Sequence, residues 1–255
     1  MNITQPPLLE VRNLSMGYDL SVVLKDVNFS VSQGEIFVVM GGSGCGKSTL
    51  QKHLIGLQQP MEGDVFYHGQ SLTLSDPHTR QQLLQRMGVL FQGGALWSFL
   101  TLLENVSLPL SEHTLLKKSE IRELATLKLA LVGLSGFEHF YPSEISGGMK
   151  KRAGLARAMA LDPEILFFDE PSSGLDPLTS QKLDDLILQI RESLGTTIVV
   201  VTHELASIFA IADRAIFLDS VTKTVLAEGN PHDLLQNSNQ SRVKQFLSRG
   251  KIGCA

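Results

Sequence analysis

The sequence predicts an α/β fold with a mixed-sheet core, an N-terminal β subdomain and an inserted helical subdomain. Apolar residues alternate in a β-type pattern over residues 8–69, and strand–helix alternation returns over residues 161–229. Between them, from about residue 99 to 157, apolar residues recur at helical spacing. A chain of 255 residues can bury one core of this kind. We expect a single domain over residues 8–247, followed by a short tail at 248–255.

Two stretches are predicted to be helical from the spacing of their apolar residues. In residues 178–194 these residues share one face, which we assign to the core. The members of this face are Leu183, Leu186, Ile187, Ile190 and Leu194. The inserted subdomain shows similar spacing at Leu115, Leu116, Ile121, Leu124, Leu127 and Leu131.

A glycine-rich loop at residues 41–49 fits the pattern G-x-x-x-x-G-K-[ST]. It follows an apolar run, residues 36–40, that is typical of a buried strand, and it precedes a helical pattern. Such a loop directs backbone N–H groups at phosphate oxygens, and the helix N-terminus adds partial positive charge. Lys47 can reach the β- and γ-phosphates, and the Ser48 hydroxyl can bind Mg²⁺. A glycine turn that binds nothing is the alternative, which the strand–loop–helix context disfavours. The loop residues are Gly41, Gly42, Ser43, Gly44, Cys45, Gly46, Lys47, Ser48 and Thr49.

Two carboxylates follow a second predicted strand. Residues 165–168 are four apolar residues, typical of a strand buried on both faces of a parallel sheet. The carboxyl ends of such strands are where α/β sheets place ligands. Asp169 would hold magnesium, and Glu170 can polarise the attacking water as general base. A solvated turn is the alternative, and the buried run before the acids disfavours it.

A second predicted helix N-terminus is suited to binding an anion. Ser146 stands where an N-cap would stand, followed by Gly147 and Gly148 and then by a strong helix former. One chain therefore carries two phosphate-binding helix starts. We expect them to serve one nucleotide from opposite sides, which requires two copies of the domain.

With these features the chain resembles the nucleotide-binding subunits of ABC transporters, over about residues 8–247. Residues 145–149 match the signature usually written LSGGQ, with Ile145 and Met149 in place of the usual Leu and Gln. Gly42 and Cys45 replace a common Pro and Ser of the phosphate loop. None of these departures removes a group that contacts phosphate.

The resemblance implies further site residues. Tyr18 falls where these domains stack an aromatic side chain on adenine, and Gln92 matches the glutamine that senses magnesium and couples to the membrane partner. Asp176 belongs to the loop that crosses the dimer, and His203 matches the switch histidine on the γ-phosphate. The implied catalytic residues are Glu170, His203 and Gln92, and the implied magnesium residues are Ser48, Gln92 and Asp169. The implied cofactors are ATP and Mg²⁺.

The segments 90–96 and 104–114, with the Met149 variant, resemble the ATPases of MCE-linked, Mla-type phospholipid transporters. The resemblance implies a peripheral subunit at the cytoplasmic side of the bacterial inner membrane. Its implied partners are a second copy, transmembrane permease subunits and an MCE-type lipid-binding protein. An importer of a small polar solute, and a soluble ABC protein without a permease, remain the alternatives. The second usually has two ATPase domains in one chain or large insertions, and neither is evident here.

Composition agrees with this interpretation. The net charge of −4 provides no basic surface for nucleic acid, so none is expected as a partner. No apolar run approaches the ~20 residues that span a bilayer, and no signal peptide is evident. Cys45 and Cys254 suggest no disulfide framework.

Four features stay open at this point. Cys45 is either a reactive thiolate in a positive loop or a small inert hydrophobe. Trp97 and Phe99 either pack in the core or line the groove that receives a permease helix. The apolar residues after residue 230 pack either on their own domain or on the other subunit. Residues 150–152 steer an anion or form a solvated helix face.

Overall fold

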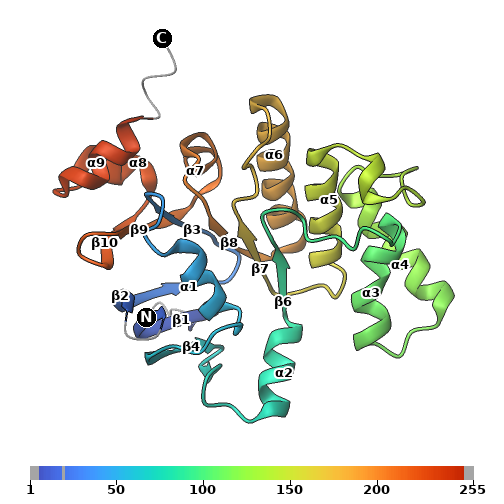
Figure 1. Cartoon of the computed structure of the whole chain (residues 1–255), viewed down its shortest axis with the longest axis horizontal. Helices are drawn as coiled ribbons and strands as arrows, with labels where there is room; N and C mark the ends of the chain where they lie inside the picture. Colours follow the sequence, from blue (N-terminus) through green and yellow to red (C-terminus); the bar gives the residue numbers. More distant parts are fainter. Residues whose placement is uncertain (1–5, 19–20, 250–255) are drawn as a thin grey trace, which may run out of the picture.

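The computed structural model describes residues 6–18 and 21–249, which form two sheets flanked by helices (Figure 1). The N-terminal sheet is antiparallel, with strand order β2-β1-β4-β5. Its strands are β1 (Leu9–Tyr18), β2 (Ser21–Val31), β4 (Glu62–Tyr67) and β5 (Gln70–Ser71). The predicted tail begins at Ser248, the last residue of the last helix, and residues 250–255, Cys254 among them, lie outside the described residues.

The second sheet has six strands in the order β10-β9-β3-β8-β7-β6. Five of them run parallel and β10 is antiparallel to β9, so the sheet is mixed as predicted. Its strands are β3 (Ile36–Gly41), β6 (Met87–Leu90), β7 (Ile165–Asp169), β8 (Thr197–Val201), β9 (Arg214–Asp219) and β10 (Thr224–Gly229). Strands β3 and β7 lie on either side of β8, which brings the ends of the two predicted motif strands to the same edge.

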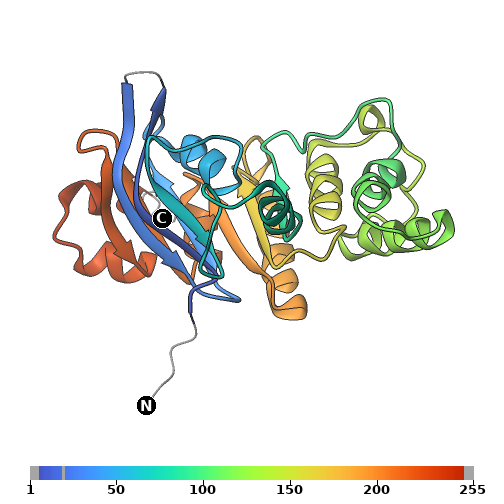
Figure 2. The same cartoon turned by 90° about the horizontal axis from the view of Figure 1, so that it is seen from below.

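Helices cover this sheet and extend beyond it. They are α1 (Lys47–Leu54), α2 (Pro77–Gln85), α3 (Leu102–His113), α4 (Lys118–Leu131), α5 (Gly147–Ala158), α6 (Pro177–Leu194), α7 (Leu205–Ile211), α8 (Pro231–Asn237) and α9 (Ser241–Ser248), with a short 3₁₀ turn at Pro142–Glu144. Figure 2 shows α3, α4 and α5 together at one end of the molecule and the N-terminal sheet towards the other. Among the described residues, no helix is long and apolar enough to cross a membrane.

The alternation of side chains along β3 separates two hydrophobic cores. Val38 and Met40 join a core with α3 to α9, whereas Phe37 and Val39 join a core with the N-terminal sheet and α1. Strand β7 divides in the same way, so all of its apolar residues are buried as predicted. The two cores therefore fix β3 and β7 in place, and the two motif loops follow directly after these strands.

The helical predictions are only partly right. Helix α6 covers the predicted stretch and buries most of its apolar face, although Leu194 is exposed. In the inserted part the helical spacing is interrupted, because α3 ends at His113 and α4 begins at Lys118. Leu115 lies in this connection and is fully exposed, and Leu127 and Leu131 are exposed on α4.

The C-terminal helices pack on their own chain. Leu234, Val243 and Leu247 are buried in the core that contains α6 and α7. The ring of Phe246 lies 5.2 Å from that of Phe217 on β9. Of the two alternatives for the apolar residues after residue 230, packing on their own domain is therefore observed for Leu234, Val243 and Leu247.

Candidate functional site

The loop between β3 and α1 holds the Lys47 side chain in a fixed cradle. Lys47 is only 7% exposed, and its ammonium donates to the carbonyl oxygens of Gly41 at 2.9 Å and Gly42 at 3.1 Å. Gly46 caps α1 with φ +100, and a Cβ there would lie 2.8 Å from Val23 Cγ1. The backbone therefore requires glycine at this position. This cradle can present the ammonium to phosphate oxygens at the start of α1.

Ser48 and Asp169 meet across the sheet edge. The Ser48 hydroxyl donates to Asp169 Oδ1 at 3.4 Å. Burial, followed by the nearby Glu170 charge, raises the pKa of the Asp169 carboxyl. A hydroxyl and a carboxylate at this distance are oxygen ligands of the kind that Mg²⁺ binds together with phosphate oxygens, so these residues fit the ion. Gln92 is held differently, because its amide donates to Ser173 Oγ at 3.4 Å.

Glu170 is held from several sides. It adopts φ +47, a left-handed conformation that is uncommon for a non-glycine residue. Its N–H donates to Val201 O at 2.8 Å, at the end of β8. Its Oε2 accepts from the Thr202 hydroxyl at 3.2 Å, and its Oε1 lies 2.7 Å from His203 Nδ1. Glu170 and His203, two of the three predicted catalytic residues, are therefore in contact.

The second predicted anion site lies on a different part of the chain. Ser146 caps α5, and its Oγ accepts from Met149 N at 3.3 Å. Helix α5 packs on α3, α4, α6 and β6, whereas α1 packs on β1, β3, β7 and β8. Ser146 and Gly147 are exposed. The two helix starts are thus carried by separate layers of the molecule.

Gly148 and Asp176 each have a packing role within the chain. A Cβ on Gly148 would lie 2.7 Å from Thr179 Cγ2, so glycine allows α5 to approach α6. Asp176 caps α6 and accepts hydrogen bonds from the Thr179 backbone and hydroxyl. Its own carboxylate is therefore engaged by α6.

Tyr18 lies beside the start of α1. Its side chain is 48% exposed, and its hydroxyl is 3.5 Å from Thr49 Oγ1. An exposed ring at this position can stack on a flat ligand bound by the loop. Its placement is compatible with the adenine contact implied by the resemblance.

Cys45 is not the activated thiol that one interpretation of the sequence predicted. It is 2% exposed, in the core shared by the N-terminal sheet and α1. Burial raises the pKa of its thiol, and the opposing charge of Lys47 is the smaller effect. The prediction of a lowered pKa is therefore wrong, because the loop turns Cys45 inward, away from solvent.

Trp97 and Phe99 are exposed, so the interpretation that both are core residues is wrong. Trp97 is 51% and Phe99 69% exposed, and their ring centroids are 5.5 Å apart. Leu100, the residue after Phe99, is half-buried. The buried Asn105 fixes this segment, because its amide bonds both the N–H and the carbonyl of Trp97.

Two basic residues of α5 make contacts that were not predicted from the sequence. Lys151 is buried, and Arg157 donates to the carbonyl oxygens of Ala95 at 2.7 Å and Gly94 at 3.1 Å. The solvated-face interpretation of residues 150–152 is thus wrong for Lys151. The helical spacing of Gly148, Lys151 and Leu155 could have predicted that Lys151 is buried, since these residues lie on one buried face of α5.

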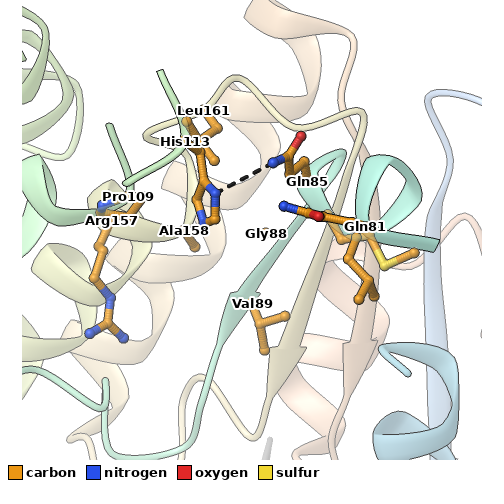
Figure 3. A pocket seen from close by; sticks show the side chains of 11 residues that line it. Gln81, Gln85, Gly88, Val89, Pro109, His113, Arg157, Ala158 and Leu161 are labelled. Atoms are coloured by element: carbon orange, nitrogen blue, oxygen red, sulfur yellow. Dashed lines mark hydrogen bonds between the residues drawn. The ribbon is translucent and has the colours of Figure 1, made fainter. Parts of the chain in front are cut away.

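A pocket of about 370 Å³ lies between α2, β6, α3 and the end of α5 (Figure 3). Gln85 Nε2 lies 3.4 Å from His113 Nδ1 across it. Arg157 lines this pocket and also binds the loop after Gln92, through the carbonyl oxygens of Gly94 and Ala95. Sequence analysis did not identify this pocket. Its lining includes Gln81, Gln85, Val89, Pro109, His113 and Arg157.

Comparison with known proteins agrees with this geometry. The family model described as ABC transporter matches residues 24–173, more than half of the chain. The chain is 40% identical over 240 residues to the intermembrane phospholipid transport system ATP-binding protein MlaF of Haemophilus influenzae, covering 94% of this chain and 90% of the relative. It is also 40% identical over 245 residues to the probable ribonucleotide transport ATP-binding protein mkl of Mycobacterium tuberculosis, covering 96% of this chain and 67% of the relative.

Solved structures of ATP-binding cassettes have the same fold as this chain. The dimeric ATP-binding cassette MJ0796, in a post-hydrolysis state bound to ADP and Pi, superposes with a TM-score of 0.79 at 31% identity, covering 87% of this chain and 98% of that chain. The cbiO1 protein of Clostridium perfringens superposes with a TM-score of 0.83 at 26% identity, covering 98% of both chains. The chain therefore belongs to the ABC transporter family, as an ATP-binding subunit that hydrolyses ATP to drive transport.

Proposed function

We propose that two copies of this chain close on two ATP molecules, each bound between the copies. One copy supplies the loop with Lys47, and the other supplies the start of α5 at Ser146. The supporting observation is that α1 and α5 pack in separate layers of the same chain. Two helix N-termini that are both suited to an anion can then meet at one nucleotide only across two copies.

Within each site, the residues have separate roles. Lys47 binds phosphate oxygens, and Tyr18 stacks on the base. Ser48 and Asp169 would hold Mg²⁺, which supplies charge stabilisation to the phosphates when bound. Glu170 orients and polarises the attacking water, while His203 holds the carboxylate and contacts the γ-phosphate. Gln92 connects this group to the loop that carries Trp97.

Mixed dimers test the shared site. Lys47→Ala should weaken ATP binding and turnover because it removes a charge-assisted phosphate contact. Ser146→Arg should leave ATP binding to the monomer nearly intact but block closure and turnover. Mixing the two variants should restore one complete site per mixed dimer, and hence measurable hydrolysis. A mixture of folded variants in which neither closure nor hydrolysis returns would contradict the shared site.

The membrane partner is proposed to dock at the pocket of Figure 3 and at Trp97 and Phe99. Arg157 joins these two places, since it lines the pocket and binds the loop that leads to Trp97. A permease segment seated here would reach the site through Gln92 and Ser173. The chain would then act as a peripheral subunit at the cytoplasmic side of the bacterial inner membrane.

Phospholipid is the proposed cargo, with an MCE-type lipid-binding protein in the complex. The support is the likeness to MlaF, which extends over 90% of the relative as well as 94% of this chain. Ribonucleotide, a small polar cargo, is the second candidate because the equally identical mkl carries that name. Purifying the complex from its native membranes and identifying bound small molecules by mass spectrometry decides between them. Phospholipid and an MCE-type subunit should co-purify, and a bound ribonucleotide with no lipid would favour the second candidate.

A further inference from the structure

A buried lysine joins α5 to the backbone of the catalytic carboxylate. Lys151 lies five positions after the cap Ser146 and is 6% exposed. Its ammonium donates to the carbonyl oxygen of Ser173 at 2.5 Å and to that of Glu170 at 3.4 Å. Helix α5 is thus joined to the segment after β7 by a cation that binds two main-chain oxygens.

The two carbonyls are the ends of one tight turn. Ser173 N–H donates to Glu170 O at 3.2 Å, which closes the turn from within. Glu170 occupies a left-handed conformation, which persists only where the surroundings fix it. Lys151 binds both ends of this turn from outside, so it constrains the direction in which the Glu170 side chain leaves the backbone.

The same turn receives the loop after β6. Gln92 donates to Ser173 Oγ, so Ser173 is held through its carbonyl by α5 and through its hydroxyl by Gln92. The backbones of this loop and α5 are also close, because a Cβ on Gly154 would lie 2.9 Å from Gly94 O. Helix α5, the Gln92 loop and the Glu170 turn therefore meet at Ser173.

The charge of Lys151 is costly where it lies. Desolvation lowers the pKa of the Lys151 ammonium, and the Glu170 charge opposes this only in part. Buried cations usually gain an ion pair in return, as Lys128 does with Asp162. Lys151 instead binds backbone carbonyls, which makes it a directional tie between two segments.

We propose that Lys151 is a positioning residue for Glu170, which ties the catalytic carboxylate to the helix whose start meets the nucleotide of the partner copy. This inference rests on the proposed roles of Glu170 and of Ser146. Contact between Ser146 and the nucleotide would fix α5, and Lys151 would pass that constraint directly to the Glu170 turn. ATP binding to the monomer does not require this tie, whereas turnover does.

Lys151→Met tests the proposal because methionine has similar length and no N–H donor. We expect turnover to fall by about 10- to 100-fold, the effect of a small misplacement of a catalytic group. ATP affinity, measured on the monomer, should change by less than about threefold, a difference of under 1 kcal/mol. Lys151→Arg, which keeps the charge and donors, should recover part of the loss. If the methionine variant does not fold, Lys151→Leu replaces it under the same criteria.

Two lysine variants serve as controls. Lys128→Met removes another buried ammonium, from α4, and should lower thermal stability without changing turnover per folded molecule. Lys150→Met changes the neighbouring residue, which is half-buried on α5 and whose ammonium makes no hydrogen bond within the described part of the chain. Turnover that falls equally in all three variants would overturn the proposal, as would unchanged turnover in Lys151→Met.

A double-mutant cycle with Glu170→Gln tests the role of Glu170 as base separately from its positioning by Lys151. If Lys151 acts through Glu170, Lys151→Met should cause no further loss in the Glu170→Gln background. An additional loss of full size would overturn the positioning role. Near-normal turnover in Glu170→Gln alone would contradict the proposed base itself, and the inference would fall with it. An inactive Glu170→Gln beside a fully active Lys151→Met would overturn only the inference.

Discussion

His203 Nδ1 lies 2.7 Å from Oε1 of Glu170, at the ends of two neighbouring parallel strands. The contact fixes one ring nitrogen on the carboxylate, while the side chain of His203 stays 47% exposed. The other ring nitrogen, Nε2, lies 3.9 Å from Glu204 Oε1 on the exposed side of the ring. In the proposed mechanism this pair orients the attacking water and contacts the γ-phosphate.

Glu170→Gln should keep the shape of this unit and remove its basic group. We expect ATP still to bind and turnover to fall by roughly 10²–10⁴. The measurement is steady-state hydrolysis beside ATP binding at equilibrium. Hydrolysis near the wild-type rate would remove Glu170 from the role of base.

His203→Ala should remove the side chain that contacts Glu170 and is proposed to contact the γ-phosphate. We expect turnover to fall by about 10² or more with nucleotide affinity largely kept. Thr202→Val is the matched control on the same carboxylate, since it removes only the 3.2 Å hydroxyl contact, and its loss should be smaller. A Thr202 variant that is less active than the His203 variant would contradict this order.

Cys45 should react slowly in the folded protein. Its thiol is buried and its pKa is raised by burial, so both access and thiolate content are low. A neutral maleimide, with labelling mapped by mass spectrometry, should modify Cys45 much faster in denaturant than in buffer. Rapid labelling of the folded chain would show that the loop opens to expose the thiol.

Local features of the site could be predicted from the sequence. The loop 41–49 is a continuous motif between a strand and a helix, so its residue types fix its conformation. The buried β7 before Asp169 was equally readable from four consecutive apolar residues. His203 was identified only through the family resemblance, and its contact with Glu170 was not predicted, because it depends on the neighbouring positions of β7 and β8.

Features that depend on distant contacts could not be predicted. The direction of Cys45 depends on how the loop packs against the core of the N-terminal sheet, and residue types do not give that direction. Lys151 looked like part of a charged run, and only the position of the turn after β7 shows what its ammonium binds. The connection at Leu115 was missed because apolar spacing continues across the gap between two helices.

Trp97→Ala should weaken binding to the permease without changing basal hydrolysis. Trp97 is exposed, its ring is tilted against that of Phe99, and its carbonyl is held by Asn105, so it is a preorganised aromatic anchor. Loss of such an anchor costs about 2 kcal/mol, or roughly 30-fold in affinity. Leu74→Ala is the control, because Leu74 is another large apolar residue, 84% exposed, in the connection before α2. Equal effects of both changes, or an unfolded Trp97 variant, would favour a general structural role.

The buried carboxyl of Asp184 should make stability depend on pH. Asp184 is 6% exposed on α6, where Oδ2 accepts from Ser207 Oγ at 2.8 Å and Oδ1 has no partner in the described part of the chain. Burial raises the pKa of Asp184 to about 6, and the charge of Asp185 adds to this. The unfolded chain loses this proton near pH 4, so stability falls as pH rises between those two values and stays lower above them.

The contribution of Asp184 is therefore fully present below about pH 4 and is lost as pH rises through about 6. A shift of about two units corresponds to about 3 kcal/mol, which sets the upper scale of the effect. Asp184→Asn cannot ionise, so above pH 7 it should be more stable than the wild type by about 1–3 kcal/mol, with the gap closing towards pH 4. Urea unfolding of both proteins from pH 4 to 8 measures this difference. Asp185→Asn, on the exposed side of the same helix, should show a much smaller gap. A wild type that stays as stable as Asp184→Asn at pH 8 would mean that the carboxyl ionises inside the fold at little cost.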